Sequence, residues 1–322
     1  MIKIALDIMG GDKAPLSNIF GAIDFLKSYK KPIKIYFVGD AKIIKKAIND
    51  VPSNLLNKIE ILHASENIDD NDKPSRIIKN KPDSSMIKSI DLLKNNRVNA
   101  VISSGNTGCL LSSSFFKLGM IDYIKRPTIP AFIPSENGNF LITDVGANVQ
   151  VKPDHLLQFS KMASVYMKYQ LDIDNPKIAL LNIGSESNKG TELTKDAYKL
   201  LDKELKNFIG NIESRYIFEG KADIILCDGF TGNIVLKLIE GMTNYNFNLI
   251  SSKLNLENNS MIDKVKKLYD YEQYGASPIL GIKGLVFKSH GSSSKIAIKS
   301  AISNAVKLCK INLVNKIQEA IN

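Results

Sequence analysis

The chain has 322 residues, 44% hydrophobic and 24% charged, so it can bury a large core and is not intrinsically disordered. No apolar run reaches the roughly 18 residues of a membrane-spanning helix, and the N-terminus does not resemble a signal peptide, which favours a cytoplasmic protein. The net charge of +10 fits a polyanionic partner, but lysine supplies almost all of it and base reading favours arginine, so no nucleic-acid partner is expected.

Short β-branched runs alternate with longer amphipathic segments, which is typical of βαβ units and a mainly parallel sheet. The expected strands are residues 2–8, 33–38, 59–63, 100–103, 140–143, 177–183, 222–227 and 285–288. The expected helices are residues 18–27, 41–48, 110–117, 153–167, 191–205, 232–250 and 294–317. No repeat or Pro-rich linker marks a border, so we expect a single domain over residues 1–322, with a protruding two-helix segment at residues 244–274.

A glycine turn with polar residues follows five of the expected strands. The turns are Gly10 to Asp12, Gly105 to Gly108, Asp144 to Asn148, Asn182 to Gly190 and Asp228 to Asn233. Glycine lets backbone N–H groups approach a ligand, and a following helix adds a partial positive charge for an anion. In one open α/β sheet such turns converge on one crevice, so together they predict a phosphate-handling site. Each turn alone is equally compatible with a tight connection in which Thr107 or Thr231 caps a helix.

Several common catalytic motifs are absent from the sequence. There is no GxGxxG and no GxSxG, and the segment Gly184 to Gly190 lacks the spacing of a P-loop. The three cysteines form no CxxC pair and the three histidines form no HExxH pair, so neither a metal site nor a disulfide framework is expected. His290 lies between a strand and a helix beside serine and glycine, which makes it the histidine favoured for function.

A collinear series of short segments carries the most specific signal. The series comprises Ala5–Asp12, Ala14-Pro15, Lys81, Asp83–Met86, Ser103–Gly108, Arg126-Pro127, Asp144–Asn148, Gln158-Phe159, Leu181–Gly184, Glu186, Lys189-Gly190, Gly210-Asn211, Glu213, Arg215, Cys227–Asn233 and Lys288–Ser293. It resembles, over nearly the whole chain, the bacterial phosphate acyltransferase family of phospholipid synthesis. The resemblance implies a three-layer α/β/α fold with a mainly parallel sheet, similar to phosphate acetyltransferases and isocitrate dehydrogenase-like folds.

The resemblance also implies the reaction and its partners. Inorganic phosphate would attack the thioester of a fatty acyl-acyl carrier protein and form acyl phosphate, without a metal or another cofactor, in the synthesis of phosphatidic acid. The implied assembly is a homodimer that contacts the inner face of the membrane peripherally, through residues 244–274, and supplies a membrane acyltransferase partner. An acidic carrier protein would suit the lysine-rich surface.

Roles for individual residues follow from the same resemblance. Lys189 would hold phosphate, Asn233 would position phosphate or the thioester carbonyl, and His290 would donate to the oxyanion or to the leaving sulfur. The residues expected to bind phosphate or the thioester are Gly10, Gly11, Asp12, Gly105, Asn106, Thr107, Gly108, Asp144, Asn148, Asn182, Asp228, Thr231 and Gly232. Asp7, Asp12, Asp144 and Asp228 are expected to order lysines and backbone donors.

Two alternatives remain open from the sequence. A phosphate acyltransferase that uses acyl-CoA, or a dehydrogenase on a similar fold, would share the glycine turns but would need adenosine or nicotinamide contacts. A silent scaffold for lipid enzymes would bind carrier protein or lipid without turnover, and the presence of Lys189, Asn233 and His290 speaks against it.

Overall fold

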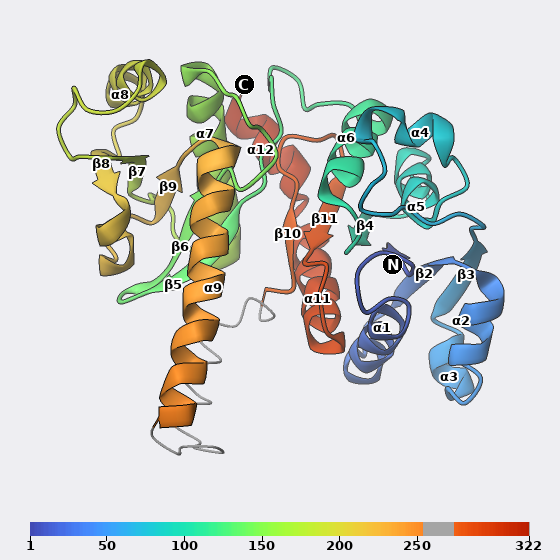
Figure 1. Ribbon diagram of the computed structural model, residues 1–322. Coiled ribbons are helices and arrows are strands. Elements are labelled where there is room, and N and C mark those ends of the chain that lie inside the picture. The colour runs from blue at the N-terminus through green and yellow to red at the C-terminus, as the bar shows by residue number, and fades with distance from the viewer. Residues whose placement is uncertain (254–273, 322) are drawn as a thin grey trace. The chain divides into compact units, whose positions relative to one another are not determined.

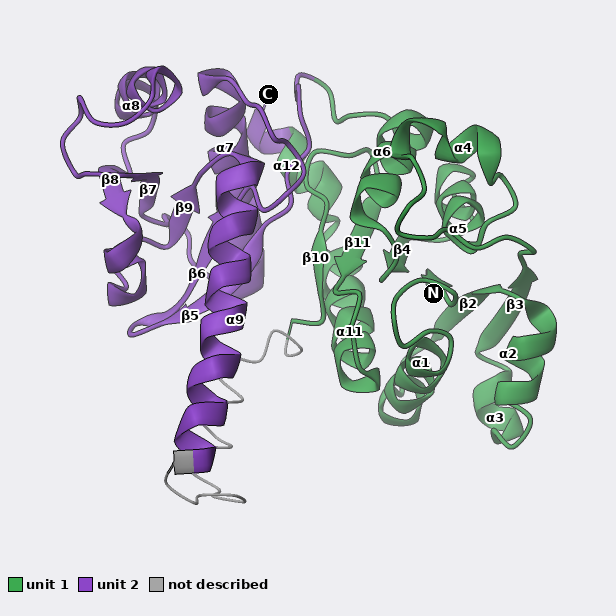
Figure 2. Cartoon of the chain, viewed as in Figure 1, with its two compact units in different colours: residues 1–122, 272–318 green, residues 123–271, 319–322 purple. Residues whose placement is uncertain are grey.

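The computed structural model describes residues 1–253 and 274–321, and the chain divides into two compact units (Figure 2). Unit 1 comprises Met1–Asp122 and Glu272–Gln318, and unit 2 comprises Tyr123–Tyr271 and Glu319–Asn322. Each unit has a sheet of its own, labelled in Figure 1. The prediction of a single domain over residues 1–322 stays a prediction.

The sheet of unit 1 is parallel except at one edge. Its strands are β1 (Ile2–Asp7), β2 (Ile33–Gly39), β3 (Ile59–His63), β4 (Ala100–Ser103), β10 (Ala276–Pro278) and β11 (Leu285–Ser289). They lie in the order β10-β11-β4-β1-β2-β3, with only β10 antiparallel to its neighbour. The central strand β1 pairs Ile4 with Ile35 of β2 and with Ala100 of β4, and the last four residues of β1 are buried. Unbroken burial of consecutive residues is typical of a parallel strand that is covered on both faces.

Helices cover the sheet of unit 1. They are α1 (Leu16–Ser28), α2 (Ala41–Ala47), α3 (Ser53–Leu56), η1 (Pro74–Arg76), α4 (Ile77–Asn80), α5 (Ser85–Lys94), α6 (Thr107–Leu118) and α11 (Lys295–Ile311), and α12 (Leu313–Ile321) ends the described chain. Helices α1 and α11 pack closely because α1 carries a glycine at the contact. A Cβ at Gly21 would lie 2.6 Å from the Cβ of Ile298, so a larger residue would push the helices apart.

The sheet of unit 2 is also mainly parallel. Its strands are β5 (Ala131–Ser135), β6 (Gly138–Thr143), β7 (Ile178–Asn182), β8 (Phe208–Glu213) and β9 (Ile224–Leu226), in the order β5-β6-β9-β7-β8. Strands β5 and β6 form an antiparallel hairpin at one edge. The helices are α7 (Pro153–Leu171), α8 (Glu192–Glu204), η2 (Ser214–Glu219) and α9 (Gly229–Lys253). Helix α7 buries Phe159 and Tyr166 in the core of this unit.

The predicted fold class is confirmed, and the structure corrects it in three places. The expected strands belong to two sheets rather than one, because residues 140–143, 177–183 and 222–227 pair with each other and not with β1 or β4. Strands β5, β8 and β10, helices α3, α4 and α5, and the short 3₁₀ helices η1 and η2 were not predicted. The helix expected over residues 294–317 is two helices, because Asn312 adopts a left-handed conformation with φ 54°.

The segment expected to protrude lies partly outside the described residues. Helix α9 begins at Gly229, earlier than predicted, and continues to Lys253. Residues 254–273 of the expected two-helix segment are not among the described residues. None of the helices formed by residues 1–253 and 274–321 is long and apolar enough to cross a membrane.

Candidate functional site

The candidate residues of unit 1 follow three strands that are neighbours in its sheet. Gly10, Gly11 and Asp12 follow β1, the segment from Gly105 to Gly108 follows β4, and His290 follows β11. The sheet order places β11, β4 and β1 side by side, and all three are parallel. Their carboxyl ends therefore lie along one edge, where α/β proteins bind ligands.

The three turns of unit 1 touch one another through glycine backbone. A Cβ at Gly10 would lie 2.7 Å from the amide nitrogen of Gly105, so the turns after β1 and β4 are in close contact. Gly11 has φ +101°, and a Cβ there would lie 2.9 Å from the carbonyl oxygen of Gly291. The amide of Asp12 donates to the same carbonyl at 2.8 Å. Glycine is required at these positions by close approach and, at Gly11, by the left-handed backbone.

Asp7 lies buried beneath these turns and ties their strands together. Its carboxylate accepts hydrogen bonds from the hydroxyls of Ser85, at 2.5 Å, and Ser103, at 2.6 Å. Burial raises the pKa of Asp7, while hydrogen bonds from these hydroxyls and from the amides of Met9 and Gly10 oppose that rise. The carboxylate thus connects β1, β4 and α5 at the edge that carries the glycine turns.

A second buried polar side chain fixes the β1 turn. The side-chain nitrogen Nδ2 of Asn18 on α1 donates to the backbone carbonyls of Asp7, Ile8 and Gly10 at 3.2, 2.9 and 3.0 Å. These bonds satisfy three buried backbone carbonyls of the turn and so stabilise its conformation. Sequence reasoning missed Asn18 and Ser85, because neither lies in a glycine turn. The signal for Ser85 was its place in the segment Asp83–Met86.

The turn after β4 starts helix α6. The carboxamide oxygen of Asn106 accepts from the amide of Cys109 at 2.9 Å and caps the helix, and its nitrogen donates to the carbonyl of Asp70 at 3.1 Å. A Cβ at Gly108 would lie 2.8 Å from Pro74. Both ends of the Asn106 side chain therefore serve the fold, and Gly108 is required by packing. This turn offers an anion the backbone N–H groups at the start of α6, a helix of twelve residues that begins at Thr107.

The turn after β11 contains His290 and is joined to the turn after β4. Lys288 donates from Nζ to the carbonyl of Ser104 at 3.4 Å. The amide of Ser292 donates to Nδ1 of His290 at 3.2 Å, and the Ser292 hydroxyl lies 2.8 Å from the same atom. Because Nδ1 accepts, the proton of the neutral imidazole belongs on Nε2. This tautomer suits a histidine that donates a hydrogen bond.

The candidate residues of unit 2 also follow three neighbouring parallel strands. Asp144 and Asn148 follow β6, and Asn182 and Lys189 follow β7. The segment from Asp228 to Asn233 follows β9, which lies between these two strands in the sheet. The same arrangement of carboxyl-end turns thus occurs in both units.

Asp144 is the buried carboxylate of unit 2. One oxygen accepts from the amides of Ile129 and Ala147, each at 3.1 Å. The other accepts from the amide of Asn148 at 2.7 Å and from its side-chain nitrogen at 2.9 Å. Burial raises the pKa of Asp144, and these four donors oppose the rise. The carboxylate is fully occupied in holding the β6 turn.

Helix α9 begins against this turn without a gap. A Cβ at Gly232 would lie 1.9 Å from the carbonyl oxygen of Asp144, which no residue but glycine can meet. The amide of Gly229 donates to the carbonyl of Asn148 at 2.8 Å. Asp228 accepts from the amide and the hydroxyl of Thr231 at 2.9 and 2.7 Å, so these two residues cap the helix.

Asn233 and Lys189 are the candidate catalytic residues of unit 2, and both are exposed. Asn233 faces Gly146, where a Cβ would lie 3.7 Å from its side chain. The ammonium of Lys189 is 3.9 Å from the carboxylate of Glu186, and half of its side chain is accessible. Asn182 holds the Lys189 turn, since its side-chain nitrogen donates to the carbonyl of Lys189 at 3.1 Å. An exposed, weakly paired cation is available to an incoming anion.

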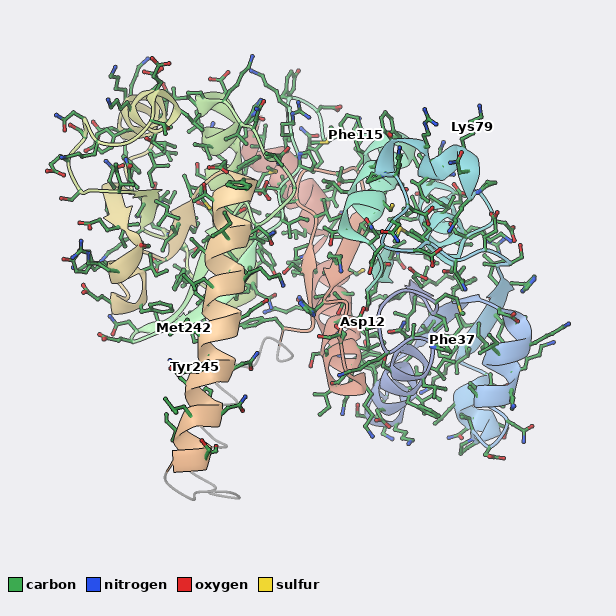
Figure 3. The ribbon with its side chains drawn as sticks, in the orientation of Figure 1. Asp12, Phe37, Lys79, Phe115, Met242 and Tyr245 are labelled. Atoms are coloured by element: carbon green, nitrogen blue, oxygen red, sulfur yellow. The ribbon has the colours of Figure 1, made fainter. Side chains whose placement is uncertain are left out.

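The structure thus assembles two sets of predicted residues, one in each unit. Unit 1 brings the turns of Gly10, Gly105 and His290 into contact, and unit 2 brings those of Asp144 and Asp228 into contact. The expectation that all five turns follow strands of one sheet is wrong, because the strands belong to two. Within the described ranges, no group of three or more His, Cys, Asp or Glu side chains is placed to hold a metal ion. Asp12 is labelled in Figure 3.

Comparison with known proteins decides the family. A protein-family model described as "Fatty acid synthesis protein" matches residues 2–316. A phosphate acyltransferase from Halothermothrix orenii is 42% identical over 334 residues, covering 100% of this chain and 99% of the relative. One from Dictyoglomus turgidum is 43% identical over 332 residues, covering 100% and 98%. The chain belongs to the phosphate acyltransferase family. The resemblance drawn from the motifs is confirmed, and the assignment to acyltransferases is confirmed with it.

Solved structures of other proteins share the fold of this phosphate acyltransferase family member. A phosphotransacetylase from Streptococcus pyogenes aligns with a TM-score of 0.60 at 15% identity, over 96% of this chain and 94% of that one. A branched-chain phosphotransacylase from Enterococcus faecalis aligns with a TM-score of 0.56 at 16% identity, over 95% and 99%. The expected similarity to the phosphate acetyltransferase fold is confirmed.

Proposed function

We propose that this phosphate acyltransferase family member moves a fatty acyl group from acyl carrier protein to inorganic phosphate, as a step in the synthesis of phosphatidic acid. The observation that carries the proposal is the match over the whole chain to relatives named phosphate acyltransferase. The glycine turns at neighbouring strand ends support it, because they offer backbone donors to an anion without any nucleotide-binding motif.

The chemistry needs positioning more than a strong base. A phosphate oxygen attacks the thioester carbonyl carbon, a tetrahedral oxyanion forms, and the carbon–sulfur bond breaks. Acyl phosphate and the carrier thiolate are the products. A thiol of pKa about 8.5 leaves with little need for protonation. Because phosphate is already anionic and nucleophilic, the protein has to orient it, neutralise its charge and stabilise the oxyanion.

The proposed roles assign one function to each candidate residue. In unit 2, Lys189 holds phosphate through its exposed ammonium, and the start of α9 around residues 229–232 offers backbone amides. In unit 1, the start of α6 around residues 105–108 offers backbone amides to an anion. Asn233 positions phosphate or the thioester carbonyl. His290 donates from Nε2 to the oxyanion or the leaving sulfur, in keeping with the bond that Nδ1 accepts from Ser292. Asp7, Asp144, Asp228 and Asn106 act indirectly, by holding these turns in place.

The carrier protein, the homodimer and the membrane contact belong to the same proposal. An acidic carrier suits a chain of net charge +10, and steering by lysine does not require the forked geometry of arginine. We place the homodimer in the cytoplasm, in peripheral contact with the inner face of the membrane, where a membrane acyltransferase consumes the reactive product.

The experiment that tests the function follows acyl phosphate directly. Purified protein is given palmitoyl-acyl carrier protein and inorganic phosphate, acyl phosphate is trapped as its hydroxamate, and palmitoyl-CoA is assayed in parallel. We expect hydroxamate that depends on phosphate and on the carrier. Equal turnover of palmitoyl-CoA would favour the acyl-CoA alternative. A folded protein that binds the carrier and forms no product would favour the scaffold.

Lys189 provides the test of the phosphate site. We expect Lys189→Ala to lower kcat/KM for phosphate about a hundredfold, because the ammonium neutralises the attacking anion. The matched control is Lys199→Ala, since Lys199 is also an exposed lysine paired with a carboxylate three residues away, on α8. A variant at Lys189 that keeps the kcat/KM of the control would contradict the clamp.

A further inference from the structure

Strand β8 is irregular at Gly210-Asn211, one of the collinear motifs of the sequence. Its pairing with β7 places Phe208 opposite Ile178 and Asn211 opposite Leu180. An unbroken register would place residue 210 opposite Leu180, so β8 contains one extra residue, which is a β-bulge. Gly210 supplies the bulge through its left-handed backbone, with φ +95°. Because a bulge changes the direction of the side chains beside it, this one determines where Asn211 points.

Asn211 reaches from β8 to the loop that contains Lys189. Its side-chain nitrogen Nδ2 donates to the backbone carbonyl of Glu186 at 2.8 Å. The carboxamide oxygen of Asn211 is buried and has no hydrogen-bond partner among the residues that the structure describes. The bond to Glu186 is therefore the polar contact that this side chain makes within the described part of the chain.

The carbonyl of Glu186 joins Asn211 to the backbone of Lys189. The amide of Lys189 donates to the same carbonyl oxygen at 3.1 Å. The carbonyl of Lys189 in turn accepts from Nδ2 of Asn182, the last residue of β7, at 3.1 Å. The backbone of Lys189 is thus held from β8 through Glu186 and directly from β7, while about half of its side chain stays accessible.

The loop has little else to fix its conformation. Residues 183–191 lie between β7 and α8 and belong to neither a helix nor a strand. Residues 185–189 are all exposed, so their side chains gain little from packing. The bonds from Asn182 and Asn211 therefore carry much of the order of this loop, and Asn211 is the one that comes from a different strand.

From these contacts we propose that Asn211 is a positioning residue, which holds the turn from Glu186 to Lys189 so that the ammonium of Lys189 meets phosphate. The inference rests on the proposed function, and it adds a residue that acts through Lys189 without touching phosphate itself. A small displacement of a group that binds the reacting anion is costly, because its contribution depends on exact placement.

The variant Asn211→Leu removes the donor at nearly constant size. The matched control is Asn207→Leu, since Asn207 is also partly exposed and donates from Nδ2 to a backbone carbonyl, that of Pro176, at 2.5 Å. We expect Asn211→Leu to raise KM for phosphate about tenfold and to leave KM for palmitoyl-acyl carrier protein unchanged. Asn207→Leu should leave both constants unchanged. If the KM for phosphate in Asn211→Leu equals that of the control, the positioning role is wrong.

A double-mutant cycle shows whether Asn211 acts through Lys189. Without the ammonium there is no cation to position, so Asn211→Leu should change kcat/KM for phosphate less than about twofold in a Lys189→Ala background. The same tenfold loss in both backgrounds would overturn the inference. A wild-type protein that forms no acyl phosphate from any carrier would instead overturn the proposed function.

Hydrogen–deuterium exchange tests the contact without any substrate, so its outcome does not depend on the proposed function. Release of the Glu186 carbonyl should loosen the bond from the Lys189 amide. We expect exchange in a peptide covering residues 184–191 to become several-fold faster in Asn211→Leu and to stay unchanged in Asn207→Leu. Equal exchange in Asn211→Leu and wild type would show that Asn211 does not hold this loop.

Discussion

Two buried aspartates play the same part in the two units. Asp7 ends β1 and Asp144 follows β6, and each places its carboxylate under a glycine turn. Each carboxylate accepts hydrogen bonds from more than one segment of the chain. Burial of such a group is tolerated because its donors replace water. We therefore propose that both residues support the turns; the expectation that Asp144 contacts phosphate stays a prediction.

Asp7→Asn is expected to change the pH dependence of stability. Burial raises the pKa of Asp7, so the folded protein keeps this proton to a higher pH than the unfolded chain does. The contribution of Asp7 to the free energy of unfolding is complete below its ordinary pKa, about 3.9, and is lost as the pH rises through the raised value. Because Asn does not titrate, the stability of Asp7→Asn relative to wild type should improve with rising pH.

Urea unfolding between acid and neutral pH measures this difference. The hydroxyls of Ser85 and Ser103 can rotate to meet an amide, so the variant keeps its local hydrogen bonds. Asp174→Asn is the control, since that side chain is 76% exposed and its replacement should leave the pH profile close to wild type. A constant difference between Asp7→Asn and wild type would contradict the raised pKa.

Cysteine reactivity follows from burial. Cys109 and Cys227 are buried and Cys309 is partly buried. Burial raises the pKa of Cys109 to about 11 and that of Cys309 to about 12, so few thiolates form near neutral pH. These side chains pack the fold and are unsuited to nucleophilic catalysis.

Sequence patterns locate residues that act locally and miss those that act across the chain. The turns of Asp144 and Asp228 were predictable, because glycine, aspartate and threonine at short spacing define a tight turn before a helix. Ser85 meets Asp7 across 78 positions of sequence, and no local pattern indicates that pair. The occupation of Asn106 by Cys109 and Asp70 was likewise invisible until the chain was folded.

Helices α11 and α12 show how one residue divides a continuous amphipathic pattern. Apolar residues recur at helical spacing through residues 294–317, so the pattern predicts one helix. Asn312 interrupts it with φ 54°, and its amide bonds back to the carbonyl of Cys309 at 3.2 Å. Asparagine tolerates this left-handed conformation better than most residues, and that preference is too weak to be recognised in a sequence.

The effect of substituting Asn312 on stability should depend on its left-handed backbone conformation rather than on its side-chain contacts. The residue is exposed, so its replacement removes little packing. We expect Asn312→Val to lower the free energy of unfolding by about 1–2 kcal/mol, since a β-branched residue is strained at positive φ. Asn312→Gly should change it by less than about 1 kcal/mol. Chemical denaturation compares the two, and a glycine variant as unstable as the valine variant would contradict the explanation.

Short and irregular elements explain the strands that were not predicted. Strand β8 contains Gly210, at φ +95°, and strand β5 contains Pro134, and both residues are typical of turns rather than strands. Strand β10 has only three residues. Tertiary pairing formed these elements against their local preference, which is why each lies at or near the edge of its sheet.

The division into two sheets is a property of the whole chain. Strand β11 pairs with β4 although about 185 positions separate them, and β9 pairs with β6 across 83 positions. Alternating strands and helices determine the α/β class, but they do not say which strands share a sheet. The family resemblance correctly indicated the reaction class because it rests on the order of motifs, which does not depend on sheet assignment.

The net charge of +10 gives a prediction about the partner. If an acidic carrier protein is drawn to this basic chain, screening weakens the encounter. We expect KM for palmitoyl-acyl carrier protein to rise several-fold from low to high NaCl while kcat changes little. Palmitoyl-pantetheine, which lacks the carrier, is the control, and its KM should not rise. The same KM for the carrier at every ionic strength would show that charge does not guide the encounter.

Helix α9 is long and is tightly packed at its first turn. Gly232 packs directly on the carbonyl of Asp144, so the first turn of α9 is tightly held. Lys253 lies 21 residues further along, about 31 Å at 1.5 Å per residue. A small change in the angle of α9 at its first turn would therefore move the end near Lys253 by a much larger distance. A contact made at the far end of α9 would therefore be transmitted along the helix to the turn that Asp144 holds.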